Sequence, residues 1–98
     1  MTEELKKQEI KIEIDDQTAN GAYSNSALIT HSETEFIIDF IFVQPQNAKA
    51  KVRSRVVLSP LHAKKLSEAL KENIAKHEIK FGQIKSQNTS HGKSEFYN

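Results

Sequence analysis

Hydrophobic and polar residues alternate along several stretches of the chain, and a two-residue period is typical of β-strands. The most apolar stretch, residues 34–44 (TEFIIDFIFVQ), is hydrophobic on both faces of an extended backbone. The first face carries Phe36, Ile38, Phe40 and Phe42, and the second carries Ile37, Ile41 and Val43, interrupted by Asp39. A strand with two apolar faces needs a cover on each of them. We therefore expect a central strand between a helix of the same chain and a second copy or another partner.

Three further stretches alternate in the same way, and turn-forming residues separate them. The predicted strands are residues 9–15, 22–30 and 50–58, and the predicted reversals are residues 16–21, 31–33 and 45–48. In the first strand Ile10, Ile12 and Ile14 share one face, while charged residues occupy the other. The pattern predicts a four-stranded antiparallel sheet whose strands follow one another in simple succession.

The alternation in residues 50–58 also predicts how this strand pairs with the central one. The expected pairs are Phe42 with Val52, Phe40 with Ser54, Ile38 with Val56 and Phe36 with Leu58. A slip by one residue would set arginines against phenylalanines, which disfavours the alternative register. The same register places Asp39 opposite Arg55, with Arg53 close by. We interpret Asp39 as a structural ion-pair residue, because the sequence offers no second group for acid–base catalysis.

A long helix is predicted over residues 59–82, because its start, its apolar stripe and its end agree. Ser59 is a favourable N-cap, Pro60 suits the first helical position, and Gly82 is a natural stop. The stripe consists of Ala63, Leu66, Ala69, Leu70, Ile74, His77 and Phe81. We expect it to cover the sheet face formed by Phe36, Ile38, Phe40, Phe42, Val52, Val56 and Leu58. The fold class is thus α+β, with one helix packed on one face of the sheet.

With 98 residues, of which 37% are hydrophobic and 28% charged, the chain fits one domain. We expect a flexible N-terminus at residues 1–8, a single α+β domain at residues 9–84 and a disordered tail at residues 85–98. The other apolar sheet face, with Ile37, Asp39, Ile41, Val43 and Val57, is the predicted interface with further copies. A dimer or a dimer of dimers is therefore expected.

Composition argues against several classes of protein. Fourteen Lys and Arg against thirteen Asp and Glu produce no strong overall field for nucleic acid or membrane. The chain contains no cysteine, its four histidines lack zinc-site spacing, and its three glycines form no phosphate-binding loop. The first residues, MTEELKKQE, lack an apolar signal core. We expect a cytoplasmic protein with no metal, cofactor or catalytic residue, and no association with membranes.

One local cluster of charge leaves a second function open. Lys51, Arg53 and Arg55 are predicted to share one face of the strand at residues 50–58, where they would contact phosphates. The competing interpretation, which we favour, is that these are solvated charges balanced by acidic residues of residues 9–16 in the same or another subunit.

Several segments together resemble a known family. They are GAYSN at residues 21–25, EFIIDFIFVQP at residues 35–45 and KVRSRVVLSPLHAKKLSEALKENIAKHEIKFG at residues 51–82. They are similar to DUF3467, a family of small bacterial and archaeal proteins defined only as a domain of unknown function. The resemblance covers roughly residues 10–84 and implies no reaction, cofactor or catalytic residue. The succession of strands and a helix that opens at Pro60 also looks like the SecB export chaperones, but their second helix has no counterpart here.

The leading functional interpretation is a non-catalytic, homo-oligomeric interaction or adaptor protein. Its more specific form is chaperone-like binding of extended polypeptides, which the SecB-like layout suggests by analogy only. The alternative is a nucleic-acid-associated protein that uses Lys51, Arg53 and Arg55. Salt-sensitive retention on DNA or RNA would favour the alternative, whereas salt-insensitive binding of an unfolded protein would favour the first.

Overall fold

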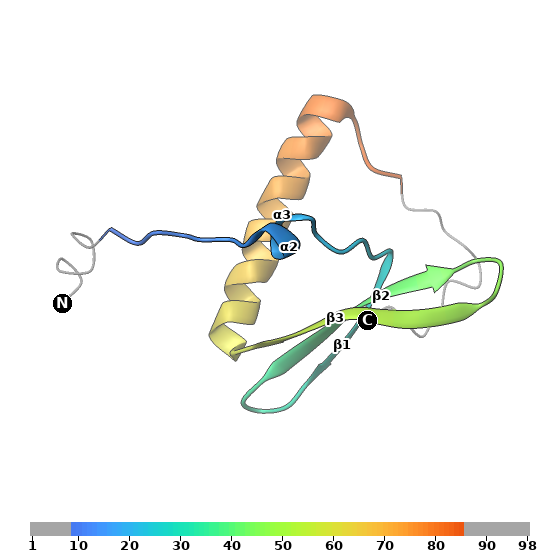
Figure 1. The fold of residues 1–98 in the computed structure, drawn as a ribbon. Coiled ribbons are helices and arrows are strands. Elements are labelled where there is room, and N and C mark those ends of the chain that lie inside the picture. The colour runs from blue at the N-terminus through green and yellow to red at the C-terminus, as the bar shows by residue number, and fades with distance from the viewer. Residues whose placement is uncertain (1–8, 86–98) are drawn as a thin grey trace.

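A computed structural model describes residues 9–85 and shows an α+β fold. Its elements are α2 (Asp16–Ala19), β1 (Ser26–His31), β2 (Phe36–Gln44), β3 (Lys49–Leu58) and α3 (Pro60–Phe81). The strands form a three-stranded antiparallel sheet in the order β1-β2-β3, and α3 follows β3 across one face (Figure 1). The predicted class, the central position of β2 and the long C-terminal helix are confirmed. The expectations for residues 1–8 and 86–98 lie outside the described residues.

The prediction of a fourth strand at residues 9–15 is wrong for the single chain. This segment, called the arm below, is extended but pairs with none of β1, β2 and β3, and it leads away from the sheet (Figure 1). Alternation of apolar and polar residues indicates which side chains favour burial. A strand also needs a neighbouring strand to bond its backbone amide and carbonyl groups, and alternation does not supply one. The predicted reversal after the arm instead contains α2, because the Asp15 side chain accepts a hydrogen bond from the Thr18 amide at 3.1 Å and caps it.

β1 begins at Ser26 and not at Ala22 as predicted. The cause is Asn25, whose side chain occupies both hydrogen-bonding groups of Val43 on the neighbouring strand. The Val43 amide donates to Asn25 Oδ1 at 2.9 Å, and Asn25 Nδ2 donates to the Val43 carbonyl at 3.1 Å. These side-chain bonds replace the backbone ladder, so the chain leaves the sheet at this point.

The predicted register between β2 and β3 is confirmed for the first half of β2 and wrong for the second. Pairs run as expected from Phe36 with Leu58 to Phe40 with Ser54, and a register shift follows between Phe40 and Ile41. Val52 then pairs with Ile41, because β3 carries Arg53 as one extra residue. This β-bulge moves Val52 from the face that α3 crosses to the opposite face.

The predicted limits of α3 are confirmed by its two caps. The His62 amide donates to Ser59 Oγ at 3.1 Å, and Pro60 occupies the first turn, where no amide is needed. At the other end Gly82 has a φ of +98°, which glycine adopts without strain, and its amide donates to the Glu78 carbonyl at 2.9 Å.

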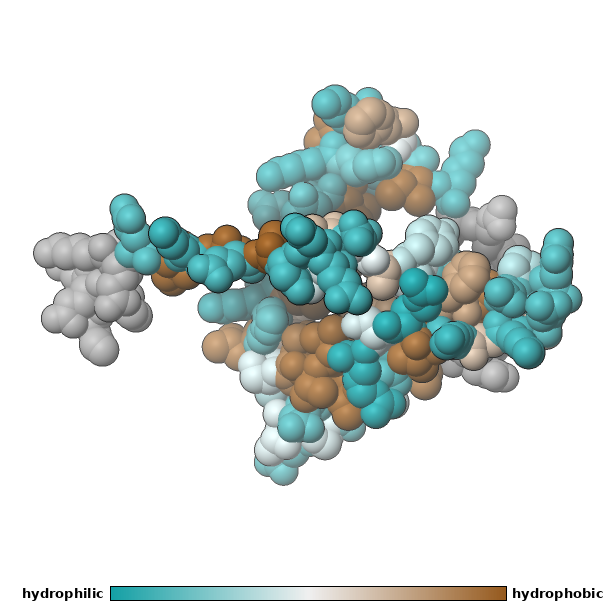
Figure 2. All heavy atoms as spheres, in the orientation of Figure 1, coloured by the Kyte–Doolittle hydropathy of each residue, from teal (hydrophilic) through white to brown (hydrophobic). Residues whose placement is uncertain are grey.

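Very little apolar surface is buried among the residues that the structure describes. Among residues 9–85, the apolar side chains that are buried belong to Ile41 and Leu58, and α3 contributes no buried residue. Hydrophobic side chains are visible along the arm and on the body of the molecule (Figure 2). A domain of this size is stabilised mainly by apolar burial. The single chain therefore exposes surface that a stable protein normally covers.

Candidate protein-interaction surface

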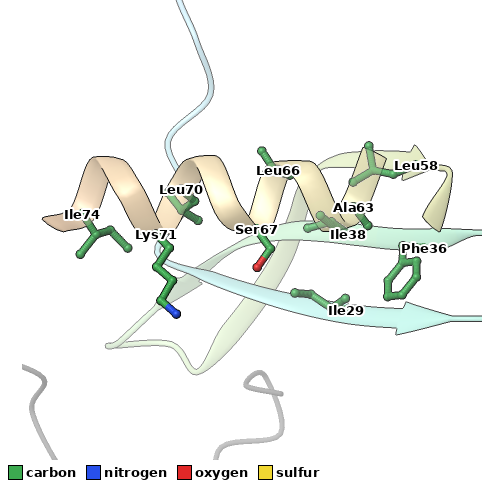
Figure 3. A pocket seen from close by; sticks show the side chains of 10 residues that line it. All are labelled: Ile29, Phe36, Ile38, Leu58, Ala63, Leu66, Ser67, Leu70, Lys71 and Ile74. Carbon is green, nitrogen blue, oxygen red and sulfur yellow. The ribbon is translucent and has the colours of Figure 1, made fainter. Parts of the chain in front are cut away.

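An open apolar groove lies between α3 and the face of the sheet that the helix crosses. It has a volume of about 500 Å³. Its lining consists of Ile29, Phe36, Ile38, Leu58, Ala63, Leu66, Ser67, Leu70, Lys71 and Ile74 (Figure 3). Eight of these ten residues are apolar, so hydrocarbon side chains form most of the groove.

The strand side of the groove follows from alternation and pairing. Phe36 and Ile38 are two residues apart on β2 and therefore share a face. Leu58 pairs with Phe36, and Ile29 pairs with Ile38, so each neighbouring strand adds an apolar residue to that face. Phe36 is also stacked on His31, with 5.5 Å between the ring centroids. The floor of the groove is thus built from all three strands of the sheet.

The helix side uses the predicted stripe only in part. Leu66, Leu70 and Ile74 line the groove but remain 40%, 57% and 41% exposed. The helix lies over the sheet without closing onto it, whereas the sequence predicted a packed interface. Phe40 and Val56, which were expected beneath the helix, stay 36% and 37% exposed and do not line the groove. Within residues 9–85, apolar surface on both sides of the groove therefore stays partly exposed.

The predicted apolar stripe did not include the polar members of the lining, Ser67 and Lys71. Ala63, Ser67 and Lys71 follow one another at intervals of four residues, which places them on one line of the helix. Figure 3 shows Ser67 and Lys71 directed toward the sheet side of α3. Lys71 is the charged residue of the lining.

Asp39 forms the ion pair that the register predicted. Arg55 Nε donates to Asp39 Oδ1 at 2.6 Å, and Arg55 NH2 donates to Oδ2 at 2.9 Å, which is a two-pronged contact. Asp39 is buried, whereas the Arg55 side chain is 63% exposed. Hydrogen bonds from Arg55 hold the pKa of the Asp39 carboxyl below its usual range, although burial opposes the shift. The pair links β2 and β3 beside the bulge.

The predicted interface residues all lie on the face opposite α3, which we call the open face. They are Ile37, Asp39, Ile41, Val43 and Val57. Ile41 is only 4% exposed within one chain, whereas Val57 is 52% exposed and adjoins solvent. The bulge adds Val52, 49% exposed, which sequence analysis had placed on the other face. Contact between this face and a second copy stays a prediction.

The predicted basic face is divided by the same bulge. Lys51 pairs with Phe42 and Arg55 pairs with Asp39, so the two cations lie on opposite faces of β3. An uninterrupted strand would have placed them on one face. Arg55 is also bound by Asp39, and Arg53 is the additional residue of the bulge. The three cations are exposed but do not form a single row.

Residues 9–85 contain no group of three or more His, Asp or Glu side chains placed to hold a metal ion. No helix within these residues is long and apolar enough to cross a membrane.

The sequence profile of the family described as "Protein of unknown function (DUF3467)" matches residues 1–86. The chain belongs to the DUF3467 family. A search of curated proteins found no match, and neither did a search of solved structures. DUF3467 membership agrees with the resemblance noted in the sequence, and the SecB likeness gains no support.

Proposed function

We propose that this DUF3467 protein is a non-catalytic interaction module that binds an apolar segment of another polypeptide in the groove between α3 and the sheet. The observation that carries the proposal is the open groove itself. Its apolar walls come from two layers of the fold that do not close on each other. In the aqueous environment such a surface is stabilised when a ligand covers it.

The lining defines the ligand. Leucine, isoleucine and phenylalanine side chains favour aliphatic groups, and Lys71 favours a carboxylate beside them. A peptide segment with alternating or helically spaced apolar residues and one acidic residue meets both requirements. If the groove recognises ligands by their apolar character and not by a particular sequence, the function is chaperone-like holding of extended polypeptides.

A labelled peptide tests the proposal directly. The probe is a fluorescein-labelled peptide in which leucine alternates with serine and which ends in glutamate, and its binding is followed by fluorescence anisotropy. A peptide with every leucine replaced by serine serves as the ligand control. We expect binding that persists at high salt, because apolar contact is not screened by ions.

Two variants of α3 provide matched proteins. Leu70→Asp changes the groove, whereas Leu61→Asp changes the same residue type on the same helix outside the lining, where Leu61 is 63% exposed. Burial of one leucine contributes about 1.5–3 kcal/mol, so Leu70→Asp should weaken binding by about 10-fold to 150-fold. Leu61→Asp should bind like the wild type. Equal binding by both variants would contradict the groove as the site, and salt-sensitive retention on RNA or DNA would favour the alternative function at Lys51, Arg53 and Arg55.

A further inference from the structure

The arm, residues 9–15, is extended but is not paired with any of the three strands of its own sheet. Its three isoleucines, Ile10, Ile12 and Ile14, are 81%, 91% and 64% exposed. They alternate with charged residues, as in a strand that is covered on one face only. Figure 1 shows the arm pointing away from the sheet and from α3. An exposed strand with an apolar face is a ready partner for another sheet.

We propose that the arm of one copy adds to the β3 edge of a second copy, and that the second copy returns its own arm in the same way. The product is a two-fold dimer with exchanged strands in which each sheet gains its fourth strand. The sequence pattern of residues 9–15 predicted such a strand. In this interpretation residues 9–15 form a strand by pairing with the sheet of another copy and not with the sheet of their own chain.

β3 is suited to receive the arm because it is an edge strand and almost fully exposed. It contains ten residues, and all except Leu58 are exposed. The arm is shorter, with seven residues that span about 23 Å at about 3.3 Å per residue, so it fits along β3. α2, which Asp15 caps, follows the arm directly, and the arm points away from the rest of the described fold (Figure 1).

Charge selects β3 over β1, the other edge of the sheet. The arm has three acidic residues, Glu9, Glu13 and Asp15, against one basic residue, Lys11; Asp15 caps α2, which leaves Glu9 and Glu13 to face a neighbouring strand. β3 has four basic residues and no acidic one, whereas the only ionisable side chain of β1 is that of His31. Arg55 is already bound by Asp39, which leaves the other three cations of β3 for the arm. Opposite charges on neighbouring strands stabilise their pairing, and like charges oppose it.

The faces of the two strands also agree. With its isoleucines on the open face, the arm would lie beside Val52 and Val57, which are 49% and 52% exposed. The acidic side chains of the arm then share the other face with Lys51. Lysines and a bulge on an edge strand discourage pairing with neutral strands. The acidic arm can still pair with β3, because its carboxylates attract the basic side chains of β3. The exchange is therefore specific for this chain.

The first experiment measures the mass of the full chain by sedimentation equilibrium for the wild type, Ile12→Ser and Ile79→Ser. Ile79 is the matched control, because it is 86% exposed on α3 and far from the arm in sequence. We expect a dimer whose dissociation constant rises at least about 100-fold in Ile12→Ser, since both arms of a two-fold dimer lose an apolar contact, and stays unchanged in Ile79→Ser. A monomeric wild type, or equal dimerisation by both variants, would overturn the proposal.

The second experiment locates the arm on its partner. The natural chain lacks cysteine, so Lys11→Cys introduces one attachment point for a photoactivated benzophenone, placed between the isoleucines. We expect a covalent dimer whose cross-linked peptide comes from Lys49–Leu58. Cross-links to Ser26–His31, or within one chain, would refute exchange onto β3. These measurements involve the arm and not the groove, so they can fail while peptide binding survives, and the reverse also holds.

Discussion

Leu58 and Val57 are neighbours on β3 that test how the chain is stabilised. Leu58 is 5% exposed and lines the groove at the point where β3 leads into α3, whereas Val57 is 52% exposed on the open face. We predict that Leu58→Ala destabilises the protein by about 2–5 kcal/mol, which is the usual range for a buried leucine. A domain of this length has a total free energy of unfolding of about 5–15 kcal/mol. Leu58→Ala should therefore remove a large part of the stability.

Val57→Ala provides the comparison. Each methylene removed from a fully buried site costs about 0.8 kcal/mol, so truncation of a half-exposed valine should cost less than about 1 kcal/mol in one isolated chain. If a second copy covers the open face, the cost approaches about 1.6 kcal/mol, and the unfolding midpoint rises with protein concentration.

The assay is urea unfolding, followed by far-ultraviolet circular dichroism at two protein concentrations that differ tenfold. Wild type, Leu58→Ala and Val57→Ala are compared at each concentration. The burial argument would be refuted if Leu58→Ala cost no more than Val57→Ala. An unfolding midpoint that is independent of protein concentration would contradict association of folded chains.

Three further predictions concern single residues. Ser59→Ala should lower the free energy of unfolding by about 1 kcal/mol, measured by thermal denaturation, because it removes the N-cap of α3; an unchanged melting temperature would contradict this. Because Arg55 lowers the folded-state pKa of Asp39, their contact stabilises the fold above about pH 3.8, and this stability is lost as the pH falls further. In Asp39→Asn the free energy of unfolding should therefore fall less steeply with decreasing pH than in the wild type. Ile41→Asp should prevent folding, whereas Phe40→Asp, at a site 36% exposed, should leave a folded chain by circular dichroism; the opposite order would reverse the assigned burial.

The last prediction shows where sequence analysis was limited. Alternation placed Phe40 beneath the helix and Ile41 at an interface with another copy, and it predicted the Asp39–Arg55 pair. The pair and the register from Phe36 to Phe40 are present because side-chain chemistry decides them locally. Burial of Ile41 depends on how closely neighbouring elements approach, and no two-residue period contains that information.

The alternation of apolar and polar residues also failed to predict the bulge in β3 and the unpaired arm, for different reasons. One extra residue, Arg53, moves the β3 residues that precede it, from Lys49 to Val52, to the opposite faces of the sheet. Nothing in the local composition marks this position. The arm has the composition of a strand but lacks a neighbour within the described part of its own chain. The candidate groove was predictable in its apolar floor and helix stripe, but its openness was not, because the angle of α3 depends on tertiary packing.

The central claim is that one folded chain leaves too much apolar surface exposed to persist alone. Sedimentation equilibrium of the full-length wild-type protein at micromolar concentration tests it most directly. We predict a folded species whose mass is an even multiple of the 11.1 kDa chain mass. A folded, monodisperse species of 11.1 kDa at that concentration would contradict the account.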